Sequence, residues 1–121
     1  MFNINADNIK GLWVTKDADL IVECYTKNNM YYGKVVWFKD ENPHRKKYSR
    51  RGIPKDEWVG YDVMSGFKFN EDKNRWEGKI TNIKYGGEYE AYANLKNGQL
   101  IVTGYVLIPI FSKQLIFTKI K

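Results

Sequence analysis

The fold is decided by residues 75–121, which read RWEGKITNIKYGGEYEAYANLKNGQLIVTGYVLIPIFSKQLIFTKIK. Polar and apolar side chains alternate over much of this stretch, as expected for strands that bury one face. The alternation predicts strands at 75–85, 87–95, 99–108 and 113–120. Gly86-Gly87 and Lys96-Asn97-Gly98 form two of the predicted turns, and Asn-Gly is a strong hairpin signal because both residues tolerate positive φ. With a third turn expected at 109–112, the segment is predicted to form an antiparallel meander.

The preceding part of the chain has the same character. Strands are predicted at 11–15, 20–26, 30–39 and 58–70, and residues 1–10 are expected to form a polar arm or a single helical turn. Many short strands joined by hairpin turns predict an all-β fold, a single antiparallel up-and-down barrel of about eight strands. Such a barrel encloses an interior that side chains can fill or that holds one small ligand. The length of 121 residues indicates one domain over 1–121.

Aromatic residues are unusually abundant, with nine Tyr, six Phe and four Trp. Aromatic rings favour strands and fill β cores, and they also line ligand cavities. For any single ring, the core is the more common role. We expect the following residues near the barrel interior: Trp13, Val35, Trp37, Phe67, Trp76, Tyr89, Ala91 and Tyr105.

Charge and cysteine content restrict the function only weakly. A net charge of +6 permits attraction to nucleic acid, anionic lipid or acidic glycans and selects none of them. The single cysteine, Cys24, shares a predicted strand face with Leu20 and Val22, so a buried and unreactive thiol is expected. No apolar run approaches the roughly 20 residues that span a bilayer. No secretory signal is recognisable at the start, so we expect a cytosolic protein or a mature form whose signal has been removed.

A long basic loop is predicted at 39–57, where the strand pattern breaks. Five cations fall within it in quick succession: Arg45, Lys46, Lys47, Arg50 and Arg51. A connection this long in a small domain is often a lid or a binding loop, and a solvated loop without a partner is the equally weighted alternative. As a lid, it would offer Arg50 or Arg51 to an acidic head group, because a guanidinium binds carboxylate and phosphate bidentately.

The sequence shows no residue pattern typical of an active site or a metal site. The one histidine, His44, lies in the basic loop without an evident orienting carboxylate, and it is twenty residues from Cys24. Glu88 and Glu90 share one strand face, which a solvated outer surface explains without catalysis. No phosphate-binding glycine loop or dinucleotide fingerprint occurs. We therefore expect neither an enzyme, nor a metal site, nor a cofactor.

Gly11-Leu12-Trp13 resembles the Gly-x-Trp signature of lipocalins. A wider resemblance, over almost the whole chain, is to the bacterial family of unknown function numbered 2147 (DUF2147), whose members have a lipocalin-like (calycin) barrel. The pieces that carry it are Gly11-Leu12-Trp13-Val14-Thr15, Tyr32-Gly33-Lys34-Val35, Asp40-Glu41-Asn42-Pro43, Trp76-Glu77-Gly78-Lys79-Ile80, Gly86-Gly87-Glu88-Tyr89 and Leu100-Ile101-Val102-Thr103-Gly104-Tyr105. The chain departs from the family at Asn82-Ile83, where Asp-Pro is usual, and at Phe117-Thr118-Lys119, where Trp-x-Arg is usual.

The resemblance implies an exported bacterial protein, periplasmic or secreted, and supplies no activity. It also implies that Trp13 closes one end of the barrel with a cation packed on it, a part that Lys119 would take. The family pattern has a lysine at Lys34. An outward-facing strand residue is the simpler interpretation, and a lysine at the barrel mouth that pairs with a ligand carboxylate is the functional one.

The leading hypothesis is a carrier or sensor that binds a small, largely hydrophobic ligand, lipid-like and acidic in one form. The candidate ligand-binding residues are Trp13, Lys34, Val35, Trp37, Arg50, Arg51, Phe67, Trp76, Tyr89, Ala91 and Tyr105. A packed barrel that acts as an envelope or surface interaction protein is the first alternative. A nucleic-acid-binding module of the OB type is the second; it would place aromatic and basic residues together on an outer strand face.

Overall fold

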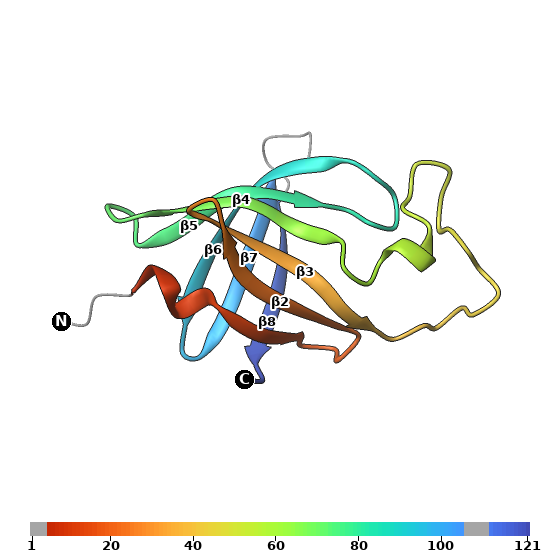
Figure 1. Cartoon of the computed structure of the whole chain (residues 1–121), viewed down its shortest axis with the longest axis horizontal. Helices are drawn as coiled ribbons and strands as arrows, with labels where there is room; N and C mark the ends of the chain where they lie inside the picture. Colours follow the sequence, from red (N-terminus) through yellow and green to blue (C-terminus); the bar gives the residue numbers. More distant parts are fainter. Residues whose placement is uncertain (1–4, 106–111) are drawn as a thin grey trace.

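Alternating strands and tight turns close the chain into a barrel. The computed structural model describes residues 5–105 and 112–121, and in it each strand pairs antiparallel with the next while the last returns to the first (Figure 1). The strands are β1 Gly11–Thr15, β2 Leu20–Lys27, β3 Met30–Phe38, β4 Asp62–Asn70, β5 Arg75–Thr81, β6 Glu88–Lys96, β7 Gln99–Tyr105 and β8 Ser112–Lys119. The predicted all-β up-and-down barrel is confirmed. Predictions that concern residues 1–4 and 106–111, including most of the turn at 109–112, lie outside the described residues.

Two short 3-10 helices complete the fold and lie at opposite ends of it. Helix η1, Ala6–Ile9, precedes β1, and helix η2, Lys55–Glu57, lies in the long connection from β3 to β4. Figure 1 shows η1 at one end of the barrel and the 39–61 connection projecting from the other. We call this connection the 39–61 loop; it extends four residues beyond the predicted 39–57 because β4 begins only at Asp62.

Glycines on the strands make room for the rings of the core. A Cβ atom at Gly78 would lie 2.6 Å from Cδ1 of Phe67, which is fully buried. In the same way, a Cβ atom at Gly104 in β7 would collide with Cδ1 of Ile80, which comes from β5, two strands away. An eight-stranded barrel is just wide enough for its side chains, so these glycines let large residues pack where two facing side chains would collide.

Helix η1 seals one end of the barrel. Ile9 is fully buried, and its carbonyl accepts a hydrogen bond of 2.8 Å from Nε1 of Trp13. The carbonyl of Ala6 accepts one of 3.0 Å from Nε1 of Trp76. Both buried indoles thereby satisfy their only polar group. The amino group of Lys119 lies 5.7 Å from the ring centroid of Trp13, which confirms the predicted end-closing pair.

A β-bulge places Trp37 outside the barrel. The register between β2 and β3 passes from Val22 opposite Val35 to Ile21 opposite Trp37, so Val36 is an extra residue in β3. The extra residue reverses the alternation, and Phe38 instead of Trp37 packs against the core. The expected interior position of Trp37 is wrong, and its side chain is 45% exposed.

Lys34 and Tyr105 are also on the outer surface. In β7, Leu100, Val102 and Gly104 are buried, so alternation turns Tyr105 outward, where it is 44% exposed and packs on Tyr92 at 5.7 Å between ring centroids. The expected interior position of Tyr105 is therefore wrong. Lys34 lies between the buried Gly33 and Val35, and its amino group is 3.6 Å from Glu23. The outward interpretation of Lys34 holds, and the position at the barrel mouth does not.

We expect Gly78→Ala to destabilise the protein by about 1–3 kcal/mol, because the new methyl group overpacks the core against the ring and the backbone of Phe67. The free energy of unfolding from urea titration measures the effect. Lys79→Ala, a change of the exposed neighbour on the same strand, should stay within about 0.5 kcal/mol of the wild type. Equal stability of both variants would contradict the packing described here.

Cys24 is buried, as expected, and burial is the main cause that raises the pKa of its thiol to about 12. Because the thiolate is the reactive form, the folded protein should resist iodoacetamide at mildly alkaline pH and react fully once denaturant is added. Mass spectrometry of the alkylated fraction checks this. Rapid alkylation without denaturant would show that β2 opens in the native state.

Candidate site at the barrel mouth

The end opposite η1, here called the mouth, keeps apolar side chains partly open to solvent. Leu20 at the start of β2 and Phe38 at the end of β3 pack against the core and are only partly buried. The same holds for Ile80 and Ile83, at and after the end of β5, and for Tyr61 just before β4. Apolar groups arranged around one end of a barrel are where a small hydrophobic ligand can dock.

Leu115 marks an opening in the barrel wall at the mouth. It lies directly opposite the buried Val102, so it belongs to the inward face, yet it is 46% exposed. The strand pairs of β1 with β8 run from Trp13–Lys119 to Thr15–Phe117, and on the side of the mouth one more hydrogen bond follows, from the N–H of Lys16 to the carbonyl of Ile116 at 2.8 Å. A hollow of about 170 Å³ lies beyond the seam, between the turn after β1 and residues 114–116. The short seam therefore leaves the inward-facing side chain of Leu115 accessible beside a hollow that polar residues of the turn also line.

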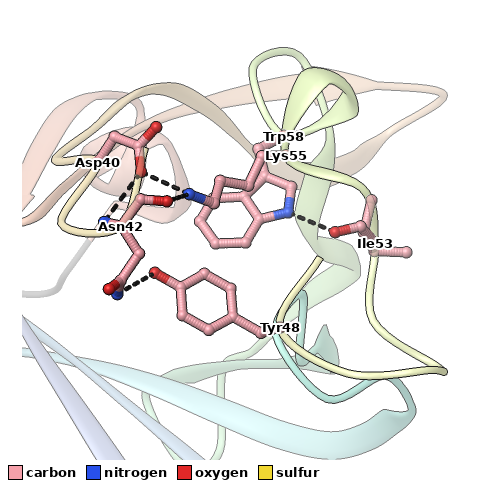
Figure 2. Close-up of polar contacts among 6 residues, drawn as sticks. All are labelled: Asp40, Asn42, Tyr48, Ile53, Lys55 and Trp58. Atoms are coloured by element: carbon pink, nitrogen blue, oxygen red, sulfur yellow. Dashed lines mark hydrogen bonds and ion pairs between the residues drawn. The ribbon is translucent and has the colours of Figure 1, made fainter. Parts of the chain in front are cut away.

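A ladder of aromatic rings connects the mouth to the 39–61 loop. The ring centroids of Phe38 and Trp58 lie 4.6 Å apart. Trp58 in turn stacks on Tyr48, with 5.6 Å between ring centroids and an interplanar angle of 20°. Trp58 is buried, and its Nε1 donates a hydrogen bond of 2.8 Å to the carbonyl of Ile53 (Figure 2). The loop consequently has a small core of its own, joined to the inner wall of the barrel through Phe38.

Lys55 organises this loop from inside. Its side chain is 8% exposed, and Nζ lies 2.6 Å from Oδ1 of Asp40 and also donates to the carbonyl of Asn42 (Figure 2). Its backbone N–H donates to the carbonyl of Lys46. A buried ammonium is tolerated only when it is paired and hydrogen-bonded, so the loop folds around this group. Sequence reasoning missed Lys55, because nothing in the pattern separates it from the other cations of the loop.

The loop is also fixed to the turn between β5 and β6, residues 82–87. The N–H of Ile53 donates to the carbonyl of Ile83 at 2.8 Å, and the hydroxyl of Ser49 donates to the carbonyl of Lys84 at 2.9 Å. A Cβ atom at Gly86 would lie 2.5 Å from the carbonyl oxygen of Arg51. The 39–61 loop is thus fixed beside the mouth by its contacts with this turn. Its role as a lid stays a prediction.

The predicted site residues divide into three groups. Five are buried in the barrel, Trp13, Val35, Phe67, Trp76 and Ala91, and Tyr89 is partly buried opposite Ile80. Trp13 and Trp76 touch η1 at the sealed end, so they do not meet the mouth. Lys34, Trp37 and Tyr105 are outside, while Arg50 and Arg51 are exposed in the loop. A part in ligand binding stays a prediction for all of them.

Two features are absent from the part of the chain that the structure describes. Within 5–105 and 112–121, no group of three or more His, Cys, Asp or Glu side chains is placed to hold a metal ion. Over the same residues, none of the helices combines the length and the apolar character needed to cross a membrane.

Comparisons with known proteins agree with the geometry. A family model described as "Uncharacterized protein conserved in bacteria (DUF2147)" matches residues 11–119. Among solved structures, the chain is similar to one described as "Protein HP1028 from the human pathogen Helicobacter pylori belongs to the lipocalin family", with a TM-score of 0.64 and 17% sequence identity, over 93% of this chain and 83% of that chain. At this identity the likeness shows a lipocalin-like fold alone. No curated protein matches the chain.

Lys55→Gln should lower the free energy of local opening of the 39–61 loop by about 1–3 kcal/mol. The reason is that Asp40 and the Asn42 carbonyl lose a buried charged donor. Hydrogen–deuterium exchange of the amides of residues 45–58 measures the change. Lys34→Gln removes the same charge from an exposed pair and should change stability by no more than about 0.5 kcal/mol. Unchanged exchange in the Lys55 variant would show that the loop is held by other contacts.

Proposed function

On the premise that this chain belongs to the bacterial DUF2147 family, as its match over residues 11–119 shows, we propose that it is a non-enzymatic binding protein. Its ligand is a small, largely hydrophobic molecule that enters the barrel at the mouth. The main support for this proposal is the exposure of Leu115. Its apolar side chain faces inward, yet the barrel does not cover it. We further propose that the protein works in the bacterial periplasm or after secretion.

The two ends of the barrel support this assignment by their difference. At the sealed end, Ile9 fills the opening and Trp13 and Trp76 bond to the backbone of η1. At the mouth, Leu20, Phe38 and Ile80 are partly exposed, and apolar surface left in contact with water is what a hydrophobic ligand would cover. A ligand therefore has one end to enter, and it would rest on the packed rings below.

A packed interaction protein without a ligand is the second candidate. It is favoured by the filled middle of the barrel, where Phe67 and Trp76 are fully buried and Phe67 presses on Gly78. This candidate and the leading proposal differ in what happens at the mouth, because only the leading proposal requires that an added apolar molecule bind there.

Titration of the protein with dodecanol, followed by backbone amide NMR shifts, tests the leading proposal. We expect saturable shifts at Leu20, Ile80 and Ile83, and none at Ile9, because the sealed end is covered. Dodecanol without effect, or shifts confined to outward-facing residues, would contradict the proposal and favour the packed barrel.

Two adjacent aromatic residues provide a matched pair of variants for this experiment. Phe38→Ala removes a ring from the inner wall of the mouth and should weaken dodecanol binding about fivefold, the loss expected for roughly one buried apolar contact. Trp37→Ala removes the neighbouring ring on the outer face and should leave the affinity unchanged. Weaker dodecanol binding by Trp37→Ala, with unchanged binding by Phe38→Ala, would contradict both the proposed site and the bulge that turns Trp37 outward. Circular dichroism melting establishes that each variant is folded.

A further inference from the structure

Three cations gather around one tyrosine ring beside the mouth. Measured to the ring centroid of Tyr48, Nζ of Lys84 lies at 5.0 Å, Cζ of Arg45 at 5.3 Å and Nζ of Lys55 at 5.5 Å. Arg45 and Lys55 belong to the 39–61 loop, while Lys84 comes from the turn between β5 and β6. Elements far apart in the sequence therefore bring three positive charges to one place, which we call the Tyr48 cluster.

The positive charge of the Tyr48 cluster is only partly neutralised. Lys55 is paired with Asp40 at 2.6 Å. Arg45 and Lys84 are exposed, and neither takes part in the ion pairs found among residues 5–105 and 112–121. Like charges held close together repel one another, and an anion placed between them would remove that cost. Arginine and lysine are also the side chains that bind carboxylates and phosphates by charge-assisted hydrogen bonds.

Contacts on both sides hold the Tyr48 cluster in place. Tyr48 stacks on the buried Trp58, and its hydroxyl lies 3.4 Å from Nδ2 of Asn42. The hydroxyl of Ser49 binds the carbonyl of Lys84, so the two segments that carry the exposed cations are joined. Sites that are ordered before binding lose less entropy when the ligand arrives. Through Trp58 and Phe38, these contacts continue to the inner wall of the mouth.

We propose that Arg45 and Lys84 bind the anionic head group, carboxylate or phosphate, of an amphiphile whose apolar part enters the mouth beside Phe38. Lys55 adds positive charge and positions the loop. This inference rests on the proposed function and names the class of its ligand. It also moves the head-group site away from Arg50 and Arg51, since neither makes a cation–π contact with Tyr48 within the described parts of the chain.

The test compares three ligands that share one tail: dodecanol, dodecanoate and dodecyl phosphate. Calorimetric titration of the wild type should show at least one of the two anions binding about tenfold more tightly than dodecanol, with the advantage lost at high salt because exposed charges are screened. The anion with the larger advantage identifies the head group. Arg45→Gln together with Lys84→Gln should remove that advantage and leave dodecanol binding unchanged.

Two control variants make the result specific. Lys73→Gln with Lys96→Gln removes the same charge from the turn after β4 and from the end of β6, both exposed and far from the mouth. This variant should retain the preference for the anion, as should Arg50→Gln with Arg51→Gln. Equal binding of all three ligands by the wild type, or equal loss in all three double variants, would overturn the head-group assignment and leave the proposed function intact. Failure of every ligand to bind the wild type would overturn both.

Discussion

Closure of the barrel depends on a short seam between the first and last strands. Strand β1 has five residues, and its pairs with β8 run from Trp13 opposite Lys119 to Thr15 opposite Phe117. These few pairs remove both free edges of the sheet and so exclude water from the core. Because the chain turns away from β8 after Lys16, whose N–H still donates to the carbonyl of Ile116, Leu115 on the inner face of β8 stays 46% exposed. One constraint thus encloses the rings and leaves the barrel accessible at the other end.

Different interactions stabilise the two ends of the barrel. At the sealed end, backbone carbonyls of η1 accept the indole hydrogens of Trp13 and Trp76, so large apolar groups are buried without an unsatisfied donor. At the mouth, a loop folds around a buried ammonium and carries its remaining cations on the surface. The barrel therefore has one covered end and one end that exposes apolar and basic side chains. The proposed binding function rests on this difference.

Much of the barrel was open to prediction because its signals are local. Alternation in β5, β6 and β7 depends only on which residues neighbour each other along the chain, and Asn97-Gly98 adopts the positive φ angles that a tight hairpin requires. The errors occurred at Trp37 and Tyr105. The bulge that turns Trp37 outward is a property of the pairing between β2 and β3, and a single strand does not show it. For Tyr105, the sequence itself holds the answer, because Leu100, Val102 and Gly104 define the inward face of β7 and alternation then places Tyr105 on the outward face.

The candidate site was much less predictable than the fold. From residues alone, the chain determined a barrel of about eight strands, a buried Cys24 and a long basic loop, because hydrophobic periodicity and turn chemistry act over a few neighbouring residues. Only the tertiary structure decided that Phe38 replaces Trp37 inside, that Lys55 is buried against Asp40, and that Lys84 meets Arg45 at Tyr48. These arrangements join segments separated by many residues, and the physical reason is that burial and charge pairing depend on distances in space, which closing the barrel creates.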